Sequence, residues 1–295
     1  MSDYSDAGSA MGQVVGGAPW EYWRMGESSG AVATGLQGTA DGAYVGAPTL
    51  GVAGAIAGDA DTAVTFNGTS QYMTAAAPSA DDVFSIACWA KRATHGVRYD
   101  GIISQGPGSY GLVWQDNDYL VLHNTFVVAL AYFPTPFPDT NWHFIVATKN
   151  GTAIHLYVDG VESTGIWATT ATGNGVNPIY FGLMPGPNYY FAGTIDEGEV
   201  WQRAITPHEV DHLYAVGKQT HITGVTRDNV GGVLVSVPVK AHYSDDGTPD
   251  GAGVTSDAST GAYSLLAGPQ PHFLVAYKVG SPDVAGVTVN TLVGS

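Results

Sequence analysis

The stretch that decides the fold runs from Ile195 to Tyr214 and reads IDEGEVWQRAITPHEVDHLY. Its first part alternates apolar and polar residues, which is typical of a β-strand with one buried face. Thr206 and Pro207 then occupy the N-cap and first helical positions of a capping box, which Glu209 completes. The stretch therefore predicts a strand that leads directly into a short helix.

The start of this helix also matches the metal-binding pattern HExxH, from His208 to His212. In zinc proteases that pattern places two histidines on one helix face, with the glutamate as general base. The capping box gives Glu209 a different role, because its side chain folds back onto the backbone of the cap. The sequence therefore predicts a helix cap and no catalytic zinc, with adventitious metal binding by the two histidines.

The helix has one apolar stripe, formed by Val210, Leu213 and Tyr214, and Gly217 is the expected helix-stopping residue. His208, Asp211 and His212 lie opposite that stripe, so we expect them to face solvent.

The composition indicates an all-β protein. The chain has 295 residues, of which 40 are glycine and only 12% are charged, and this suits many short strands joined by tight turns. Cys88 is the single cysteine, so no intramolecular disulfide is possible, and its apolar strand context predicts a buried, unreactive thiol.

The negative charge of the chain argues against two classes of partner, nucleic acids and anionic membranes. A formal net charge of -16 repels the phosphates of nucleic acids and of anionic membranes, so neither is expected as a partner. The longest apolar runs are too short to span a bilayer, so no membrane insertion is expected. Residues 1–10 have neither the basic start nor the apolar core of a secretory signal, and none is expected.

Strand signals extend on both sides of the deciding stretch and divide the chain. They begin at Trp20 and include tight-turn signals at Asn67-Gly68 and Asp159-Gly160. A second series of short alternating segments starts after Lys218. We therefore predict an N-terminal arm (1–17), a large β-sandwich (18–217) and a small β-sandwich (218–295).

The large segment resembles the laminin-G-like, or concanavalin A-like, jelly-roll family. The pieces that carry the resemblance occur in the family's order: Tyr22 to Glu27, Phe66 to Tyr72, Phe84 to Trp89, Trp142-His143, Leu156 to Gly160 and Ile195 to Tyr214. The resemblance covers about two thirds of the chain and implies the fold, while function has to be argued from the site.

The C-terminal segment resembles the carboxypeptidase-regulatory-like, or transthyretin-like, β-sandwich. The resemblance rests on Ile222 to Asp228, Val237 to Ala241 and Thr255 to Leu265. That family is not catalytic and usually acts as a spacer or stabilising module. The pairing of the two modules resembles virion proteins of tailed bacteriophages, although bacterial surface proteins also combine them.

The resemblance implies two kinds of rim site. Some relatives hold Ca²⁺ at the rim of the sandwich, and the candidate ligands here are Glu27 and Asp196. The sequence contains no contiguous ligand loop, so a metal-free rim remains open and no other cofactor is implied. Laminarinase-type glucanases of this fold use paired carboxylates, but the segment departs from their E-x-D-x-x-E pattern, because Ile195 stands two residues before Glu197.

Aromatic residues near the expected loops are candidates for a sugar-binding platform. A sugar ring can stack its C–H face on a flat aromatic side chain with a polar edge. The candidates are Tyr99, Tyr110, Trp114, Trp167, Tyr189 and Tyr190. The alternative for each is a place in the core or in an interface, and Tyr189 and Tyr190 stand out because a Pro- and Gly-rich loop precedes them.

Together these observations predict a non-enzymatic virion surface protein, either a decoration protein or a fibre adhesin. Its expected partners are other virion proteins, its own copies and polysaccharide of the host cell surface. Multiple copies would make weak contacts useful. Two alternatives remain: a secreted or surface carbohydrate-binding protein of a bacterium, and a glycan-cleaving enzyme of the laminarinase type.

Overall fold

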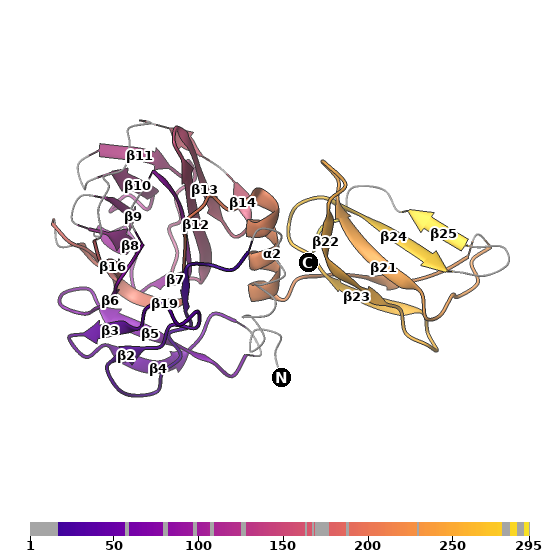
Figure 1. Cartoon of the computed structure of the whole chain (residues 1–295), viewed down its shortest axis with the longest axis horizontal. Coiled ribbons are helices and arrows are strands. Elements are labelled where there is room, and N and C mark those ends of the chain that lie inside the picture. The colour runs from indigo at the N-terminus through magenta and orange to yellow at the C-terminus, as the bar shows by residue number, and fades with distance from the viewer. Residues whose placement is uncertain are drawn as a thin grey trace. The chain divides into compact units, whose positions relative to one another are not determined.

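The structure is a computed structural model. The chain folds into two compact units (Figure 1). The first unit ends at Ile205 and the second continues from Thr206, so the helix groups with the second unit by its contacts. The sequence-based boundary at residue 218 places this helix in the first module instead. The described residues are 17–56, 59–78, 82–96, 99–106, 109–124, 128–162, 164–166, 168, 177–186, 189–228, 230–278, 284–287 and 292–294.

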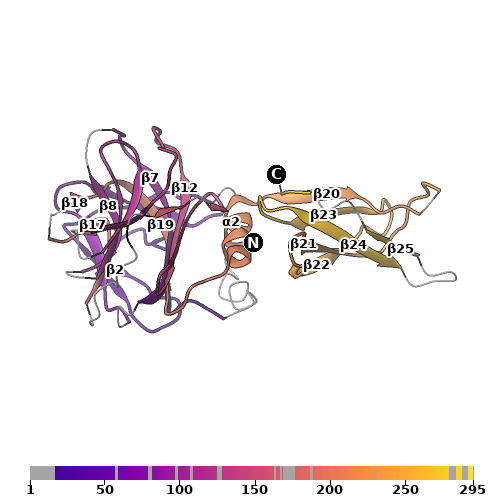
Figure 2. The same cartoon turned by 90° about the horizontal axis from the view of Figure 1, so that it is seen from above.

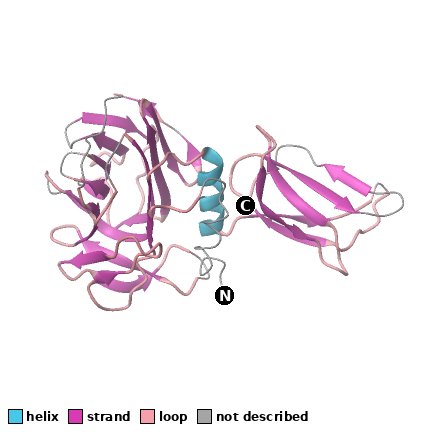
Figure 3. Cartoon of the chain, in the orientation of Figure 1, coloured by secondary structure: helices cyan, strands magenta, loops and turns pink. Residues whose placement is uncertain are grey.

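The expectation of an all-β fold is confirmed, because strands dominate the described residues of both units (Figure 3). The N-terminal arm predicted for residues 1–17 lies outside the described residues except for Gly17. No helix in the described ranges is long and apolar enough to cross a membrane.

One sheet of the first unit is built around the long strands β7 and β19, which pair antiparallel. In spatial order its strands are β14 (Val161–Glu162), β13 (Ala153–Val158), β12 (His143–Asn150), β7 (Val83–Arg92), β19 (Ala192–Trp201), β5 (Thr62–Asn67) and β4 (Thr49–Ala53), and β1 (Glu21–Trp23) pairs with β19. The Asp159-Gly160 signal forms the predicted hairpin turn, between β13 and β14.

A second sheet packs against the first, and Figure 2 shows the two layers from above. Its strands in spatial order are β15 (Gly165–Ile166), β11 (Val128–Tyr132), β10 (Leu120–Asn124), β9 (Tyr110–Trp114), β8 (Asp100–Gln105), β16 (Ile179–Phe181), β6 (Tyr72–Ala75), β3 (Gly42–Val45) and β2 (Val32–Ala33). A short hairpin of β17 (Leu183–Met184) and β18 (Tyr189–Tyr190) lies against β8. The Asn67-Gly68 turn carries the chain from β5 in the first sheet to β6 in the second.

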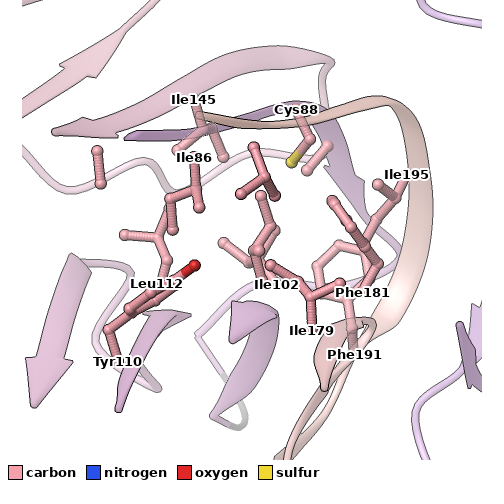
Figure 4. Packing of buried hydrophobic residues seen from close by; sticks show 14 of the residues in the cluster. Ile86, Cys88, Ile102, Tyr110, Leu112, Ile145, Ile179, Phe181, Phe191 and Ile195 are labelled. Atoms are coloured by element: carbon pink, nitrogen blue, oxygen red, sulfur yellow. The ribbon is translucent and has the colours of Figure 1, made fainter. Parts of the chain in front are cut away.

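The core of the first unit lies between these sheets (Figure 4). Side chains of alternate residues fill it because successive residues of a strand point to opposite faces. Ile86 and Cys88 of β7 meet Ile102 of β8 and Leu112 of β9 in one cluster. Cys88 is fully buried, and burial first, then the charges of nearby carboxylates, raises the pKa of its thiol, which agrees with the expected unreactive role.

The second unit contains the helix and a smaller sandwich. Helix α2 spans Pro207–Lys218, one residue beyond the predicted stop at Gly217. Its C-cap is Gln219, which adopts the left-handed conformation. One sheet pairs β20 (His221–Val225) with β23 (Ala262–Leu266), and the other has the order β22 (Pro249–Thr255), β21 (Pro238–Tyr243), β24 (His272–Lys278) and β25 (Val284–Val287). Their shared core includes Ile222, Val239, Leu265 and Leu274.

Candidate functional site

A β-bulge in β19 shapes the acidic end of the first unit. The pairing of β19 with β7 shifts register between Asp196 and Glu199, and Glu197 has a positive φ of 52°. A side chain at Gly198 would collide with Phe181 of the core, so this glycine allows the close approach of the strand. The bulge interrupts the simple alternation that the sequence suggested for this strand.

Arg24 pairs with one carboxylate of this bulge and with two carboxylates that precede β5. Its guanidinium nitrogens lie 2.6 Å from Asp59, 2.9 Å from Asp61 and 3.1 Å from Glu197. The hydroxyl of Tyr22 donates a hydrogen bond to the other oxygen of Glu197. Glu197 is thus held by an ion pair and a hydrogen bond, which is the arrangement a buried carboxylate needs.

The two candidate metal ligands, Glu27 and Asp196, lie beside this cluster. Glu27 accepts hydrogen bonds from the Thr34 amide and the Tyr44 hydroxyl, both at 2.7 Å. Asp196 Oδ2 accepts one from the Ala55 amide at 2.7 Å, whereas its buried Oδ1 has no hydrogen-bond partner among the described residues. Burial first, then the charge of Glu27 and further down the order that of Asp196, raise the pKa of Tyr44.

Burial governs the protonation of the acids in β19. It raises the pKa of Asp196 to about 7, with a further increase from the nearby Asp61 charge. Burial also raises the pKa of Glu197 and of Glu199, and for Glu197 the Glu199 charge adds to the effect. Carboxylate oxygens are the donors that hard cations such as Ca²⁺ select, which keeps Asp196 as a candidate ligand.

Two of the predicted platform residues are corrected by the structure, because Tyr110 and Trp114 lie in the core. Each is 1% exposed. Tyr110 stacks on Phe84 with centroids 4.0 Å apart, and Trp114 stacks on Phe191. Both share the inner face of β9 with Leu112, which lies between them, so neither ring is available to a ligand at the surface.

Tyr99 and Tyr189 form an aromatic pair at the surface of the first unit. Their rings stack with centroids 5.0 Å apart and an interplanar angle of 23°. Both side chains are half-buried. The pKa of Tyr99 is raised by burial first, then by the charge of Asp116 and by that of Tyr189. The exposed carboxylate of Asp116 therefore lies close enough to act on this pair.

Tyr190 belongs to a second aromatic group on neighbouring strands. Its ring centroid lies 6.3 Å from that of Tyr72, which in turn lies 5.8 Å from that of Tyr180. All three rings are half-buried. Of the predicted platform residues, the structure therefore brings Tyr99 and Tyr189 together and places Tyr190 in a separate group, while Trp167 lies outside the described residues.

Asp118 fixes the loop that leads to Tyr99. Its carboxylate pairs with Arg92 at 2.9 Å and accepts a hydrogen bond from the Gly96 amide at 2.7 Å. Asp118 itself adopts a positive φ of 68°, in the turn that also contains Asp116. The turn at Asp118 is thus joined to Arg92 and Gly96, and this link was not apparent from the sequence.

The expected helix cap in the second unit is confirmed. The Glu209 amide donates to Thr206 Oγ1 at 3.2 Å, and the Thr206 amide donates to Glu209 Oε2 at 2.7 Å. Glu209 is therefore engaged in the cap rather than available as a general base.

The expected orientation of the rest of the helix is wrong in one respect. Asp211 is fully buried instead of facing solvent, and His212 is only 20% exposed. A helical wheel shows only which residues share a face of the helix. In the second unit, residues of β22 and β24 cover the face that contains Asp211 and His212.

Comparisons with known proteins agree with the architecture. Residues 67–211 match the Laminin_G_3 family model, described as the concanavalin A-like lectin/glucanases superfamily. No curated protein sequence matches the chain. The large β-sandwich is therefore a concanavalin A-like domain, as the sequence predicted.

Solved structures match at low sequence identity. The binding domain of botulinum neurotoxin serotype D/C aligns with a TM-score of 0.52 at 10% identity, covering 94% of this chain and 80% of that one. A mutant of Trypanosoma rangeli sialidase displaying trans-sialidase activity aligns with a TM-score of 0.51 at 13% identity, covering 72% of this chain and 37% of that one. The chain thus spans little more than a third of that sialidase, and these likenesses show the fold alone.

These matches correct one prediction, that the chain is not an enzyme. The superfamily description includes glucanases, and the matched structures include a sialidase. The fold therefore gives no ground for excluding catalysis, and glycan cleavage has to be measured directly.

Proposed function

We propose that the first unit binds carbohydrate on the stacked rings of Tyr99 and Tyr189. The observation that carries the proposal is the pair itself, two half-exposed phenols held nearly parallel at 5.0 Å beside an exposed carboxylate. A flat apolar surface with polar groups at its edge suits the C–H face and the hydroxyls of a sugar ring.

The aromatic pair is suited to weak and repeated contacts. Tyrosine offers a large contact area at low conformational cost, because its side chain has few rotatable bonds. Asp118, bonded to both Arg92 and Gly96, reduces the freedom of the loop before binding. Many copies on one particle would convert such contacts into firm attachment, since tethering raises the effective concentration.

Calcium bound by Asp196 and Glu27 is the second part of the proposal. Asp196 would hold the ion with its unpaired Oδ1, and Glu27 would supply a second carboxylate. The ion would supply positive charge to buried acids and so stabilise the loops that contain Gly26 and Gly54, whose backbones pack on the Asp61 and Asp196 carboxylates.

The biological setting that we propose is the surface of a bacteriophage virion, where the protein serves as a decoration protein or a fibre adhesin. The pairing of a concanavalin A-like domain with a second small β-sandwich supports this setting. The second unit would act as a transthyretin-like spacer, with other virion proteins, further copies of the chain and host polysaccharide as partners. A bacterial surface or secreted location is the alternative.

The experiment is a screen of the full chain on an array of glycans and bacterial polysaccharides, with calcium and then with a chelator. The same wells are assayed for released reducing sugar. The proposal predicts binding to at least one glycan, and weaker binding after chelation. Absence of binding in both conditions contradicts the carbohydrate proposal, and released sugar would show that the bound glycan is also a substrate.

A further inference from the structure

Three buried side chains of the second unit converge on one point, and they come from different elements. Asp211 belongs to α2, Asp250 to β22 and His272 to the start of β24. Their exposed fractions are 0%, 3% and 0%. His272 Nε2 lies 3.1 Å from Asp250 Oδ2 and 3.8 Å from Asp211 Oδ2, and the three donor atoms all lie within 4.8 Å of one another.

The atoms that face this point are Asp211 Oδ2, Asp250 Oδ2 and His272 Nε2, and none of them makes a hydrogen bond of suitable geometry among the described residues. Their contacts with one another are those of an ion pair, which forms when the His272 ring is protonated. Burying two carboxylates and an imidazole without well-formed hydrogen bonds is destabilising, and three such groups rarely meet without a reason. Their convergence is an observation independent of the mere presence of acidic residues.

The other oxygen of each carboxylate has a hydrogen-bond partner outside the common point. Asp211 Oδ1 accepts a hydrogen bond from the Gln270 amide at 2.9 Å. Asp250 Oδ1 lies 3.0 Å from His212 Nδ1. Each carboxylate therefore directs its second oxygen toward the common point, as outer hydrogen bonds do around metal ligands.

The backbone also adapts to this arrangement. A side chain at Gly268 would lie 2.4 Å from the Asp211 carboxylate, so only glycine fits there. His272 is held by paired backbone hydrogen bonds with Leu292, at 2.6 and 3.0 Å. The hydroxyl of Tyr243 donates to the His208 carbonyl at 3.0 Å. Burial first, then the charges of Asp250 and Asp211, raise the pKa of Tyr243, so this phenol borders the same group.

We propose that Asp211, Asp250 and His272 form a Zn²⁺ site that ties α2 to β22 and β24. Two carboxylates and a neutral imidazole carry a charge of -2, which one divalent ion balances. Zinc accepts such oxygen and nitrogen ligands at roughly 2.0–2.2 Å in tetrahedral geometry, which separates neighbouring ligand atoms by about 3.4 Å. The observed separations of 3.1 and 3.8 Å bracket that value.

This site differs from a zinc protease centre. Glu209 is engaged in the helix cap, and the histidines of the HExxH pattern are not its ligands: His212 supports Asp250, and His208 stacks on Tyr243. The role that follows is structural, because the ion would join a helix to two strands. It would also relieve the cost of burying two negative charges.

A second group of donors in the same unit serves as the internal control. His208 lies near Asp245 and Asp246, but the two carboxylates are exposed. Exposed acids are solvated without a metal, so this group gives no reason for tight binding. A substitution here should leave a buried site intact.

The test measures zinc binding by the full chain after removal of metal with a chelator, using calorimetry and elemental analysis. The proposal predicts one tightly bound Zn²⁺ per chain. Asp211→Asn and His272→Gln should each weaken binding by about 100-fold or more, whereas His208→Gln and Asp245→Asn should change it little. Zinc should raise the melting temperature of the unsubstituted protein but not that of Asp211→Asn.

Two results would overturn the proposal. One is a chain that binds no zinc. The other is zinc binding that survives both buried-site substitutions or is lost in His208→Gln. Asp211→Asn keeps the shape and one oxygen of the side chain, and circular dichroism of the metal-free variants checks their folding.

X-ray absorption of the zinc-loaded, unsubstituted protein provides a measurement that needs no variant. One imidazole with oxygen ligands supports the site, and two imidazoles would identify the HExxH histidines instead.

Discussion

Tyr99 and Tyr189 lie far apart in the sequence, yet their rings stack with centroids 5.0 Å apart. Tyr99 directly precedes β8, and Tyr189 opens β18, a strand of the hairpin that lies against β8. The packing of this hairpin on β8 therefore brings together two rings that are 90 positions apart in the sequence.

The stacked pair should act as one unit in binding. We expect Tyr99→Ala and Tyr189→Ala each to weaken glycan binding, because either change leaves the other ring without its stacking partner. The double variant should lose little more than one single variant, since each ring supports the other. A double-mutant cycle on an immobilised glycan measures this, and fully additive losses would show that the rings bind independently.

Trp114 should behave as a core residue. Trp114→Ala is expected to lower the free energy of unfolding by about 3–5 kcal/mol, because it empties a large volume between the sheets. Tyr189→Ala, at the surface, should cost much less. Denaturant titrations of the two variants test this, and equal losses would contradict the assignment of Trp114 to the core.

Thr206 should contribute to stability through the helix cap. Thr206→Ala removes the hydroxyl that accepts the Glu209 amide, so the free energy of unfolding should fall by about 1 kcal/mol. Val230→Ala is the control, because Val230 is 83% exposed. Equal stability of the two variants would mean that the cap contributes nothing.

His143 should make stability depend on pH. Burial lowers the pKa of His143, but its hydrogen bonds and ion pairs with Asp159 and Asp139 outweigh burial and raise the pKa above 6.5 overall. The folded state therefore holds the proton more tightly than the unfolded state. The resulting stabilisation is complete below about pH 6.5 and is lost as the pH rises through the folded pKa.

The measurement is the unfolding free energy of the unsubstituted protein and of His143→Gln across this range. The unsubstituted protein should lose stability relative to the variant as the pH rises. Parallel curves would exclude His143 as the source.

Calcium should stabilise the first unit through Asp196. Added Ca²⁺ is expected to raise the melting temperature of the unsubstituted protein, because binding to the folded state shifts the folding equilibrium. Asp196→Asn should lose most of that increase, whereas Asp139→Asn, at an exposed loop, should keep it. An identical calcium response in Asp196→Asn would remove this residue from the proposed site.

Much of the fold was predictable because its signals are local. The capping box at Thr206 and the Asp159-Gly160 turn need only short-range geometry, and both formed as expected. The core positions of Tyr110 and Trp114 were also predictable in principle, since both share one face of β9 with Leu112, two residues away in each direction. Their predicted place in a surface platform was wrong, because this face packs in the core.

The rest depends on contacts between distant segments. Asp211 is buried because it lies beside His272, and a helical wheel cannot predict a contact with a residue outside the helix. The bulge at Glu197 likewise changes the direction of one side chain without an unusual sequence, apart from the adjacent Gly198. Such features require the folded chain.

The most direct test of the account is the affinity of Tyr189→Ala for the glycan that the unsubstituted protein binds best, with Tyr119→Ala as the matched control. Tyr119 is also half-buried and pairs edge-on with Tyr132. Carbohydrate binding at this pair predicts a loss of about tenfold for Tyr189→Ala, equivalent to roughly 1.4 kcal/mol, and little change for Tyr119→Ala. Unchanged affinity of Tyr189→Ala, or equal losses in both variants, would contradict carbohydrate binding at the Tyr99–Tyr189 pair.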